Sequence, residues 1–343
     1  MGRLMCPPRR DVTYSRCVRD RRTTRGRAGI IAATVVALVL PLSAAPLAHA
    51  VTSDSPSVPP SPTSTHSTAP PKDATWVTVR VSPASGSVLG VATTITAVFT
   101  SAVQRKATAE RHMKVYANST LVDGAWYWKS DYRAVFRPKI MWPGHVKVSV
   151  RLSLSNVTLA ESSTRVWVGT ATSNRTHSFS IGRRLVAKVI DSQHRMYVYI
   201  DGTRVRTIPV SLGKPGFITR SGVKAVMEKY LQRTMTSQAL GITDPADQYE
   251  VTAPYAVRIT TSGEFVHGAP WANYRIGRFN GSHGCTNVFL SDSRWFYDTV
   301  LPGDPVITSG TGRAMEPWNG TGGPWNIPWS TWLLHSAAKG QTP

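Results

Sequence analysis

Residues 264–271 read EFVHGAPW and residues 281–287 read GSHGCTN, and these two stretches decide how the second half of the chain is interpreted. Cys285 lies close to two histidines, His267 and His283, and follows directly after a glycine. The chain has only two other cysteines, Cys6 and Cys17, and both lie near its amino terminus. A lone thiol among histidines and glycines indicates a candidate catalytic nucleophile.

The chemistry of the thiol requires a partner that can take its proton. An ordinary cysteine has a pKa near about 8.5, so only a few per cent of it is thiolate at neutral pH, and a nearby imidazolium raises that fraction. His267 and His283 are both candidates for the base, and the sequence alone leaves the choice open. Gly284 leaves space for a substrate carbonyl and lets nearby backbone N–H groups point toward a developing oxyanion.

The residues around this motif predict a β-rich unit over residues 183–309. The stretch LVAKVI begins near Arg184, and RMYVYIDGTRVRTIPVSLG predicts a hairpin that turns at Asp201-Gly202. Helical periodicity is weak, and its best candidate is a short helix over residues 291–300 with Ser291 as its cap. We therefore expect mostly strands and one short helix in this unit.

Residues 75–182 predict an all-β sandwich. Short alternating stretches such as VTVRV, TITAVF and HVKVSVRL are separated by Gly, Pro, Asn and Ser turns. Four aromatic residues could form a carbohydrate platform, but we interpret them as core or turn packing. They are Trp126, Tyr127, Trp128 and Trp142.

The ends of the chain differ from the two folded units. Residues 310–343 form a Trp-rich extension, and we expect Trp325, Trp329 and Trp332 to dock onto the preceding β-rich unit, since together they would make a large exposed apolar patch. Residues 51–74 are rich in Ser, Thr and Pro, which is typical of an extended linker. Residues 1–50 carry a basic segment, an apolar run and the sequence Ala48-His49-Ala50, a pattern typical of a secretory signal peptide or of an amino-terminal membrane anchor.

The charge of the chain is strongly basic. The formal net charge is +21, of which +7 belongs to residues 1–50 and +14 to the rest. Nucleic acid, anionic lipid and anionic cell-wall polymer all suit such a charge, and export favours the cell wall. We therefore predict an exported monomer, secreted or anchored at the outer face of the cytoplasmic membrane, that binds anionic cell-wall polymers and no nucleic acid.

The motifs resemble those of the L,D-transpeptidase family. SHGCTN, with the histidine of FVHGAPW eighteen residues before its cysteine, resembles the family signature. GKPGFITRSGVKAVMEKY, the GDPV turn and WNIPW resemble the actinobacterial branch, and the preceding region resembles the immunoglobulin-like domain found there. The resemblance implies a mainly β chain, with an immunoglobulin-like β-sandwich followed by a β-rich L,D-transpeptidase catalytic domain, a short helix and the Trp-rich tail.

The resemblance also implies roles for the residues of the motif. Cys285 would be the nucleophile and His267 the general base. The backbone carbonyl of His283 would accept the other ring N–H of His267 and fix its tautomer, as the third member of a triad does. The backbone N–H groups of Gly284 and Cys285 would form the oxyanion hole.

Further residues are implied to contact substrate. Tyr249 aligns with a flap tyrosine above the acyl pocket, and Met235 is a candidate for the same lid. Thr286 stands where the family usually has a hydrophobic residue. The remaining substrate-binding candidates are Ser262, Gly263, Trp271, Ser282 and Asn287.

The implied reaction is acyl transfer on peptidoglycan. A donor tetrapeptide stem would acylate Cys285 with release of D-Ala, and an acceptor stem would then form a cross-link between third residues. β-Lactams of the carbapenem class would be covalent inhibitors. Two alternatives stay open: an L,D-carboxypeptidase or stem-to-other-amine transferase with the same site, and a non-catalytic cell-wall-binding protein.

No metal or other cofactor is expected. A zinc site would need three or four N or S ligands, and residues 51–343 contain a single cysteine. The chain also has no glycine motif for binding phosphate.

Overall fold

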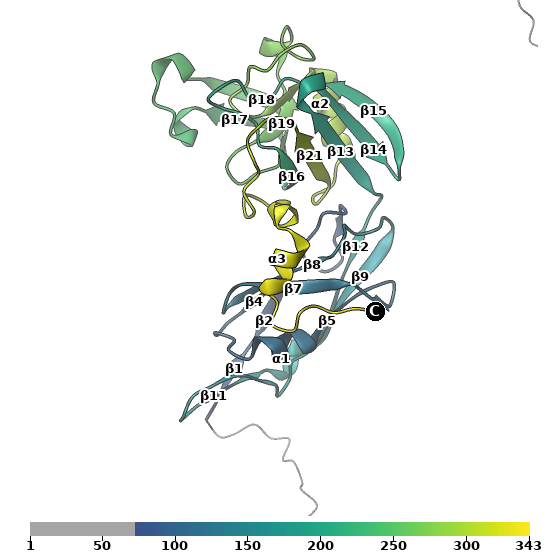
Figure 1. Cartoon of the computed structure of the whole chain (residues 1–343), viewed down its shortest axis with the longest axis vertical. Helices are drawn as coiled ribbons and strands as arrows, with labels where there is room; N and C mark the ends of the chain where they lie inside the picture. Colours follow the sequence, from purple (N-terminus) through teal and green to yellow (C-terminus); the bar gives the residue numbers. More distant parts are fainter. Residues whose placement is uncertain (1–72) are drawn as a thin grey trace, which may run out of the picture. The chain divides into compact units, whose positions relative to one another are not determined.

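The structure is a computed structural model that describes residues 73–343. The predicted signal segment (1–50) and nearly all of the predicted linker (51–74) lie outside the described residues. Within residues 73–343 the chain is mainly β, as predicted (Figure 1). None of the helices there is long and apolar enough to cross a membrane.

Three sheets form from residues 74–181. In β9 (Val146–Ser153), buried side chains alternate with more exposed ones, which is why these residues form a strand with one face toward a core. The first sheet has the order β1 (Ala74–Val77), β11 (Val166–Gly169), β10 (Thr158–Glu161). The second has the order β2 (Val79–Ser82), β4 (Ile95–Phe99), β8 (Arg133–Pro138), β7 (Gly124–Ser130). The third has the order β3 (Val88–Leu89), β12 (Asn174–Ile181), β9, β5 (Met113–Ala117), β6 (Thr120–Leu121).

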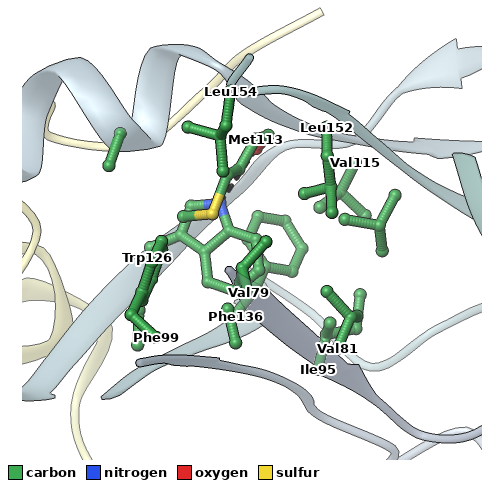
Figure 2. Packing of buried hydrophobic residues seen from close by; sticks show 14 of the residues in the cluster. Val79, Val81, Ile95, Phe99, Met113, Val115, Trp126, Phe136, Leu152 and Leu154 are labelled. Carbon is green, nitrogen blue, oxygen red and sulfur yellow. Dashed lines mark hydrogen bonds between the residues drawn. The ribbon is translucent and has the colours of Figure 1, made fainter. Parts of the chain in front are cut away.

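The core between these sheets contains three of the four aromatic residues that the sequence singled out in residues 75–182, which we call the first unit. Trp126, Trp128 and Trp142 are all buried, and the indole N–H of Trp126 donates to the carbonyl of Met113 at 3.0 Å (Figure 2). Tyr127 packs instead against Trp332 of the carboxyl-terminal extension. The interpretation of these residues as core packing, rather than as a carbohydrate platform, is therefore confirmed.

Two further sheets form from residues 185–309. One has the order β15 (Thr203–Pro209), β14 (Arg195–Ile200), β13 (Leu185–Ile190), β21 (Pro305–Ser309), β16 (Gly222–Ala225). The other has the order β17 (Glu228–Thr236), β18 (Glu250–Arg258), β19 (Phe265–Gly268), β20 (Thr286–Val288). Both sheets contribute buried side chains to one continuous cluster, which includes Val189, Val257, Val266 and Phe296. This cluster holds β19 in place, and β19 carries His267.

The predicted hairpin is confirmed. β14 and β15 pair as antiparallel strands, and Asp201 and Gly202 between them have φ of 49° and 89°. Positive φ at both central residues is typical of the tight turn that joins two twisted strands.

The predicted helix is present, but its cap is wrong. α2 (Leu290–Thr299) begins one residue before Ser291, and Phe289 occupies the capping position without a side-chain hydrogen bond. The helix packs on β18 and β19. The other helices in residues 73–343 are α1 (Lys106–Arg111) and α3 (Trp329–Leu334), with short 3-10 turns η1 (Ala171–Ser173), η2 (Asp191–Gln193), η3 (Gln238–Leu240), η4 (Pro245–Asp247), η5 (Pro270–Ala272) and η6 (Gly323–Asn326).

The carboxyl-terminal extension docks differently from the prediction. Asn326 does pair with the preceding β-rich unit, since its side chain accepts from the N–H of Val223 and donates to the Val223 carbonyl, both at 2.8 Å. Trp332, however, is fully buried against strands of the first unit, and its indole N–H donates to the carbonyl of Ala125 at 3.0 Å. The expectation of docking onto the preceding β-rich unit is therefore wrong for Trp332, because this side chain shares a buried cluster with Ala125 of β7 and Val135 of β8.

Candidate active site

His267 and Cys285 come together because their strands are neighbours. β19 and β20 pair as parallel strands, with His267 opposite Asn287, and Cys285 directly precedes β20. Both side chains line one pocket of about 230 Å³. The fold thus unites the two residues that the sequence singled out, although eighteen positions separate them.

The imidazole of His267 is held in one orientation. The side chain is only 3% exposed, and its Nδ1 lies 2.9 Å from the carbonyl oxygen of Gly268. A carbonyl oxygen can only accept, so Nδ1 carries the proton and Nε2 keeps its lone pair when the ring is neutral. Trp271, which is 45% exposed, stacks on the ring with centroids 6.0 Å apart.

The predicted partner of this ring was wrong. We expected the carbonyl of His283 to accept the ring N–H of His267, but Gly268 accepts it. The reason is local: the carbonyl of Gly268 is at the end of β19 and lies within reach of the side chain that precedes it.

Burial keeps both reacting groups neutral at pH 7. It raises the pKa of the Cys285 thiol to about 12, with a smaller opposite effect from the backbone N–H of Phe265. It also lowers the pKa of His267 to about 4, against the opposite effect of its bond to Gly268. The resting pair is therefore thiol and imidazole, and not the thiolate beside an imidazolium that the general chemistry of such pairs suggested.

Residues 282–285 form the turn that carries Cys285, which we call the nucleophile turn, and hydrogen bonds within it close it. The hydroxyl of Ser282 donates to the carbonyl of Cys285 at 2.6 Å and accepts the N–H of Gly284 at 3.1 Å. Gly284 has φ of +114°, a conformation that residues with a Cβ rarely adopt. Its N–H donates to Ser282 in this arrangement, and the glycine permits the turn. That the N–H of Gly284 serves an oxyanion stays a prediction.

His283 connects this turn to the segment before β18. Its ring lies between Phe217 and Tyr249, with centroids 4.6 and 4.7 Å away, and its Nε2 lies 3.4 Å from a carboxylate oxygen of Asp247. Burial, followed by the charge of Lys214, lowers the pKa of His283. Lys214 also forms an ion pair with Asp247 and is the main cause that lowers the pKa of that carboxyl. The Lys214–Asp247 pair could not be predicted from the sequence, because its members are 33 residues apart and follow no motif.

The predicted substrate-binding residues fall into two adjacent pockets. Met235 and Tyr249 line both. Trp271, Ser282 and Asn287 line the 230 Å³ pocket with the catalytic candidates, whereas Ser262 and Gly263 line a second pocket of about 470 Å³. The thiol of Cys285 points toward the carbonyl oxygen of Gly263, 3.8 Å away, so the two pockets meet near the sulfur.

Asn287 offers an unused polar group. Asn287 is only 5% exposed. Its side-chain oxygen is buried and has no hydrogen-bond partner among residues 73–343. A buried acceptor without a partner is costly, so a ligand N–H is a natural partner for it.

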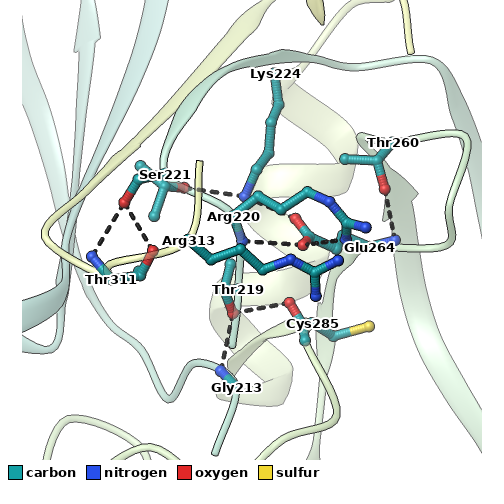
Figure 3. Close-up of polar contacts among 12 residues, drawn as sticks. Gly213, Thr219, Arg220, Ser221, Lys224, Thr260, Glu264, Cys285, Thr311 and Arg313 are labelled. Carbon is teal, nitrogen blue, oxygen red and sulfur yellow. Dashed lines mark hydrogen bonds and ion pairs between the residues drawn. The ribbon is translucent and has the colours of Figure 1, made fainter. Parts of the chain in front are cut away.

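Behind the nucleophile lies a buried cluster of charges. The carboxylate of Glu264 pairs with Lys224 at 2.7 Å and with the guanidinium of Arg220 at 3.0 Å (Figure 3). Lys224 is fully buried and Glu264 is 3% exposed. The cluster ties the residue before β19 to β16, and thereby fixes the strand that carries His267. In the part of the chain that the structure describes, no group of three His, Cys, Asp or Glu residues is placed to hold a metal ion.

Thr219 is a residue that sequence reasoning missed. It is fully buried, and its hydroxyl donates to the carbonyl of Gly284 and accepts the N–H of Gly213, both at 2.8 Å (Figure 3). The hydroxyl thus anchors the residue directly before Cys285. Its only sequence signal was its place within GKPGFITRSGVKAVMEKY, to which no role was assigned.

Thr219→Val is expected to lower the free energy of unfolding by about 2 kcal/mol or more, since it leaves a buried N–H and a buried carbonyl without a partner. Denaturation in urea measures the change. Thr219→Ser keeps the hydroxyl and loses one methyl group, so it should cost only about 1 kcal/mol. Equal midpoints for the Val and Ser variants would show that the hydroxyl does not anchor the turn.

Comparisons with known families agree with this geometry. Residues 184–308 match the L,D-transpeptidase catalytic domain, and residues 48–158 match a bacterial Ig domain. L,D-transpeptidase 2 of Mycobacterium tuberculosis is 32% identical over 258 residues, which are 75% of this chain and 62% of that protein. L,D-transpeptidase 1 of the same species is 34% identical over 233 residues, 67% of this chain and 84% of that protein.

Solved structures give the same result. An L,D-transpeptidase from Mycobacterium smegmatis superposes with a TM-score of 0.56 at 32% identity and covers 68% of this chain and 99% of its own. The L,D-transpeptidase LdtMt1, solved in complex with imipenem, superposes with a TM-score of 0.57 at 33% identity over the same shares. The match to the catalytic domain, residues 184–308, includes the strands that position His267 and Cys285. Together the comparisons confirm the resemblance and the immunoglobulin-like domain predicted from the sequence. This chain therefore belongs to the L,D-transpeptidase family.

Proposed function

We propose that the chain is a peptidoglycan L,D-transpeptidase that acts through an acyl-enzyme on Cys285. The observation that carries the proposal is the orientation of His267, whose Nδ1 proton is bound by Gly268 so that its Nε2 is left as a base in the pocket of Cys285. Because the chain spans 62% of the length of L,D-transpeptidase 2, the reaction, substrates and partners of the whole protein are part of the proposal.

The acylation step starts from the neutral pair. As Sγ of Cys285 attacks the carbonyl carbon of the third stem residue, its proton moves to Nε2 of His267, and the S–C bond forms. The C–N bond to the terminal D-Ala then breaks, and the proton on Nε2 passes to the leaving amine. The backbone N–H of Cys285 is our candidate for the oxyanion donor.

The second step returns the enzyme to its starting state. The side-chain amine of the third residue of an acceptor stem attacks the thioester and loses a proton to Nε2 of His267, and that proton returns to Sγ as the S–C bond breaks. The product is a cross-link between third residues. If water attacked instead, the outcome would be hydrolysis, so access of water to the thioester decides between them.

Two pockets suit a reaction with two substrates. The pockets of about 230 and 470 Å³ share Met235 and Tyr249, and the thiol lies where they meet. We infer that Tyr249 and Met235 act as a flap between donor and acceptor, and that the free side-chain oxygen of Asn287 accepts an N–H of the donor stem. The ring contact between Tyr249 and His283 would link the position of the flap to the nucleophile turn.

Incubation with a disaccharide tetrapeptide, followed by mass spectrometry, tests the reaction. A cross-linked dimer with release of D-Ala is expected. A trimmed monomer would indicate an L,D-carboxypeptidase, and an exchanged terminal amine would indicate a transferase for other amines. No change in any stem would leave a non-catalytic wall-binding protein and overturn the proposal.

Covalent inhibition gives an independent test of the same thiol. L,D-transpeptidase LdtMt1 has been solved with imipenem, and L,D-transpeptidase 3 of Mycobacterium tuberculosis with a faropenem-derived adduct. We propose that carbapenems acylate Cys285 of this chain. The intact protein should then gain the mass of one ring-opened carbapenem.

We also propose that the exported chain binds anionic cell-wall polymers through its +14 charge beyond residue 50. Since exposed charges are screened by salt, binding of the purified protein to isolated sacculi should weaken as ionic strength rises. A sedimentation assay at low and high salt measures this. Binding that does not depend on ionic strength would contradict the proposal.

A further inference from the structure

We propose that Arg275 recognises a carboxylate group of the donor stem and makes the enzyme selective for donors that carry it. The inference rests on the proposed function for its substrate, but its first test does not. Nothing in the motif pointed to this residue, which lies in the loop between η5 and the nucleophile turn.

Arg275 is held at the reacting centre. It lines the 230 Å³ pocket together with Cys285 and His267, and its Nη1 donates to the carbonyl of Gly281 at 2.6 Å. Its side chain lies directly across Gly281, where a Cβ would come within 2.7 Å of Cδ and Nη1. The glycine therefore makes room for the guanidinium, which is set in one place beside the nucleophile.

The guanidinium lacks a partner of opposite charge. Several other partly buried arginines have such a partner, for example Arg183 with Asp304 and Arg206 with Asp292. Among residues 73–343 no carboxylate lies within ion-pair distance of Arg275, and its buried Nε has no acceptor. Asp247, whose carboxylate contacts His283 of the nucleophile turn, is already paired with Lys214.

An arginine with free donors in a substrate pocket is suited to a carboxylate. Its planar fork matches the two oxygens of that group, and it binds a neutral amide of the same shape less well, because the amide offers one acceptor oxygen and no charge. Two groups near the bond that breaks have this chemistry: the terminal carboxylate of the D-Ala that leaves, and the side-chain carboxylate of the third residue. The shared prediction is a preference for the free acid over the amide at one of these positions.

The first experiment uses small probes and the full chain. Iodoacetate and iodoacetamide alkylate the same thiol and differ by one charge, and peptide mapping reports the rate at Cys285. Arg275→Met should lower the ratio of the iodoacetate rate to the iodoacetamide rate by about three- to tenfold. Arg278→Met, in the same loop but exposed and outside the pocket lining, should leave the ratio nearly unchanged.

The second experiment uses three donor tetrapeptides: the free acid, the amide of the terminal carboxylate, and the amide of the side-chain carboxylate. For the parent protein, one of the two amides should lower kcat/KM by about 10- to 100-fold, and the one that does so identifies the bound group. Arg275→Met should turn over all three nearly equally, and Arg278→Met should keep the preference. Arg275→Gln, which retains a donor for the Gly281 carbonyl, should repeat the result and controls for damage to the loop.

The two proposals fail separately. If the parent protein turned over no stem while its alkylation ratio depended on Arg275, the proposed transpeptidase function would be wrong. Binding of a carboxylate by Arg275 would still be supported. A parent protein that turns over all three stems equally, or an Arg275→Met variant that keeps the preference and the ratio, overturns the inference about Arg275.

Discussion

Cys285→Ser is expected to lower kcat/KM for stem transfer by at least about 10⁴-fold. The serine hydroxyl is a far weaker acid than a thiol, and the imidazole that must take its proton has its pKa lowered by burial to about 4, so it is too weak a base for that task. The variant should also gain no mass from a carbapenem. Dimer formation and intact-protein mass measure the two effects.

The chain provides a matched control for this variant. Cys6 and Cys17 carry the same thiol and belong to the segment that we predict to be a signal peptide or an anchor. Replacing both with serine should leave kcat/KM and the carbapenem adduct unchanged. Retention of more than about a hundredth of the activity by Cys285→Ser would place the nucleophile elsewhere.

The sequence was sufficient for the parts of the fold and site that local patterns encode. Alternating apolar residues predicted the strands. Asp201-Gly202 predicted the hairpin turn because such a pair readily adopts the positive φ that both central residues of a tight turn need, and the structure shows this φ at both. The pair Cys285 and His267 could be singled out because thiol chemistry needs a base and the family motif supplies the spacing. The pocket that both residues line agrees with this choice.

The parts that failed depend on contacts between distant residues or on the exact end of an element. The acceptor for His267 is the carbonyl of Gly268, which follows from how β19 ends. Trp332 docks against Ala125, 207 residues away, and Lys214 meets Asp247 across 33 residues. No periodicity or motif specifies such pairs, since they arise only when the sheets are assembled.

His267→Gln is expected to lower kcat/KM at pH 7 by about 10³- to 10⁴-fold, since the base that takes the thiol proton is lost. With the pKa of Cys285 raised to about 12, only about one thiol in 10⁵ is ionised at pH 7 without that base. The residual rate of the variant should therefore rise about tenfold for each unit of pH. The parent protein should be nearly flat above about pH 5 and lose activity as pH falls through about 4, where His267 becomes protonated.

The free energy of unfolding should also depend on pH through His267. The pKa of His267 is about 4 in the folded protein, against an ordinary value of 6.5 for histidine, so on acidification the unfolded chain takes up a proton first. The parent protein should lose about 3 kcal/mol of unfolding free energy as pH falls from about 6.5 to 4, and above this window the contribution is constant. His267→Gln should lack this loss, which urea denaturation across the window measures.

His283→Gln distinguishes the two histidines that the sequence left open as bases. His283 contacts Phe217, Tyr249 and Asp247. Loss of these contacts should make the nucleophile turn less rigid and lower kcat/KM by about tenfold. The cause would be a less exact placement of Cys285 and not a change in proton transfer. The flat profile above pH 5 should remain in this variant. If the pH dependence of the residual rate appeared in His283→Gln and not in His267→Gln, the base would be His283, and the neutral pair of Cys285 and His267 could not be the reacting one.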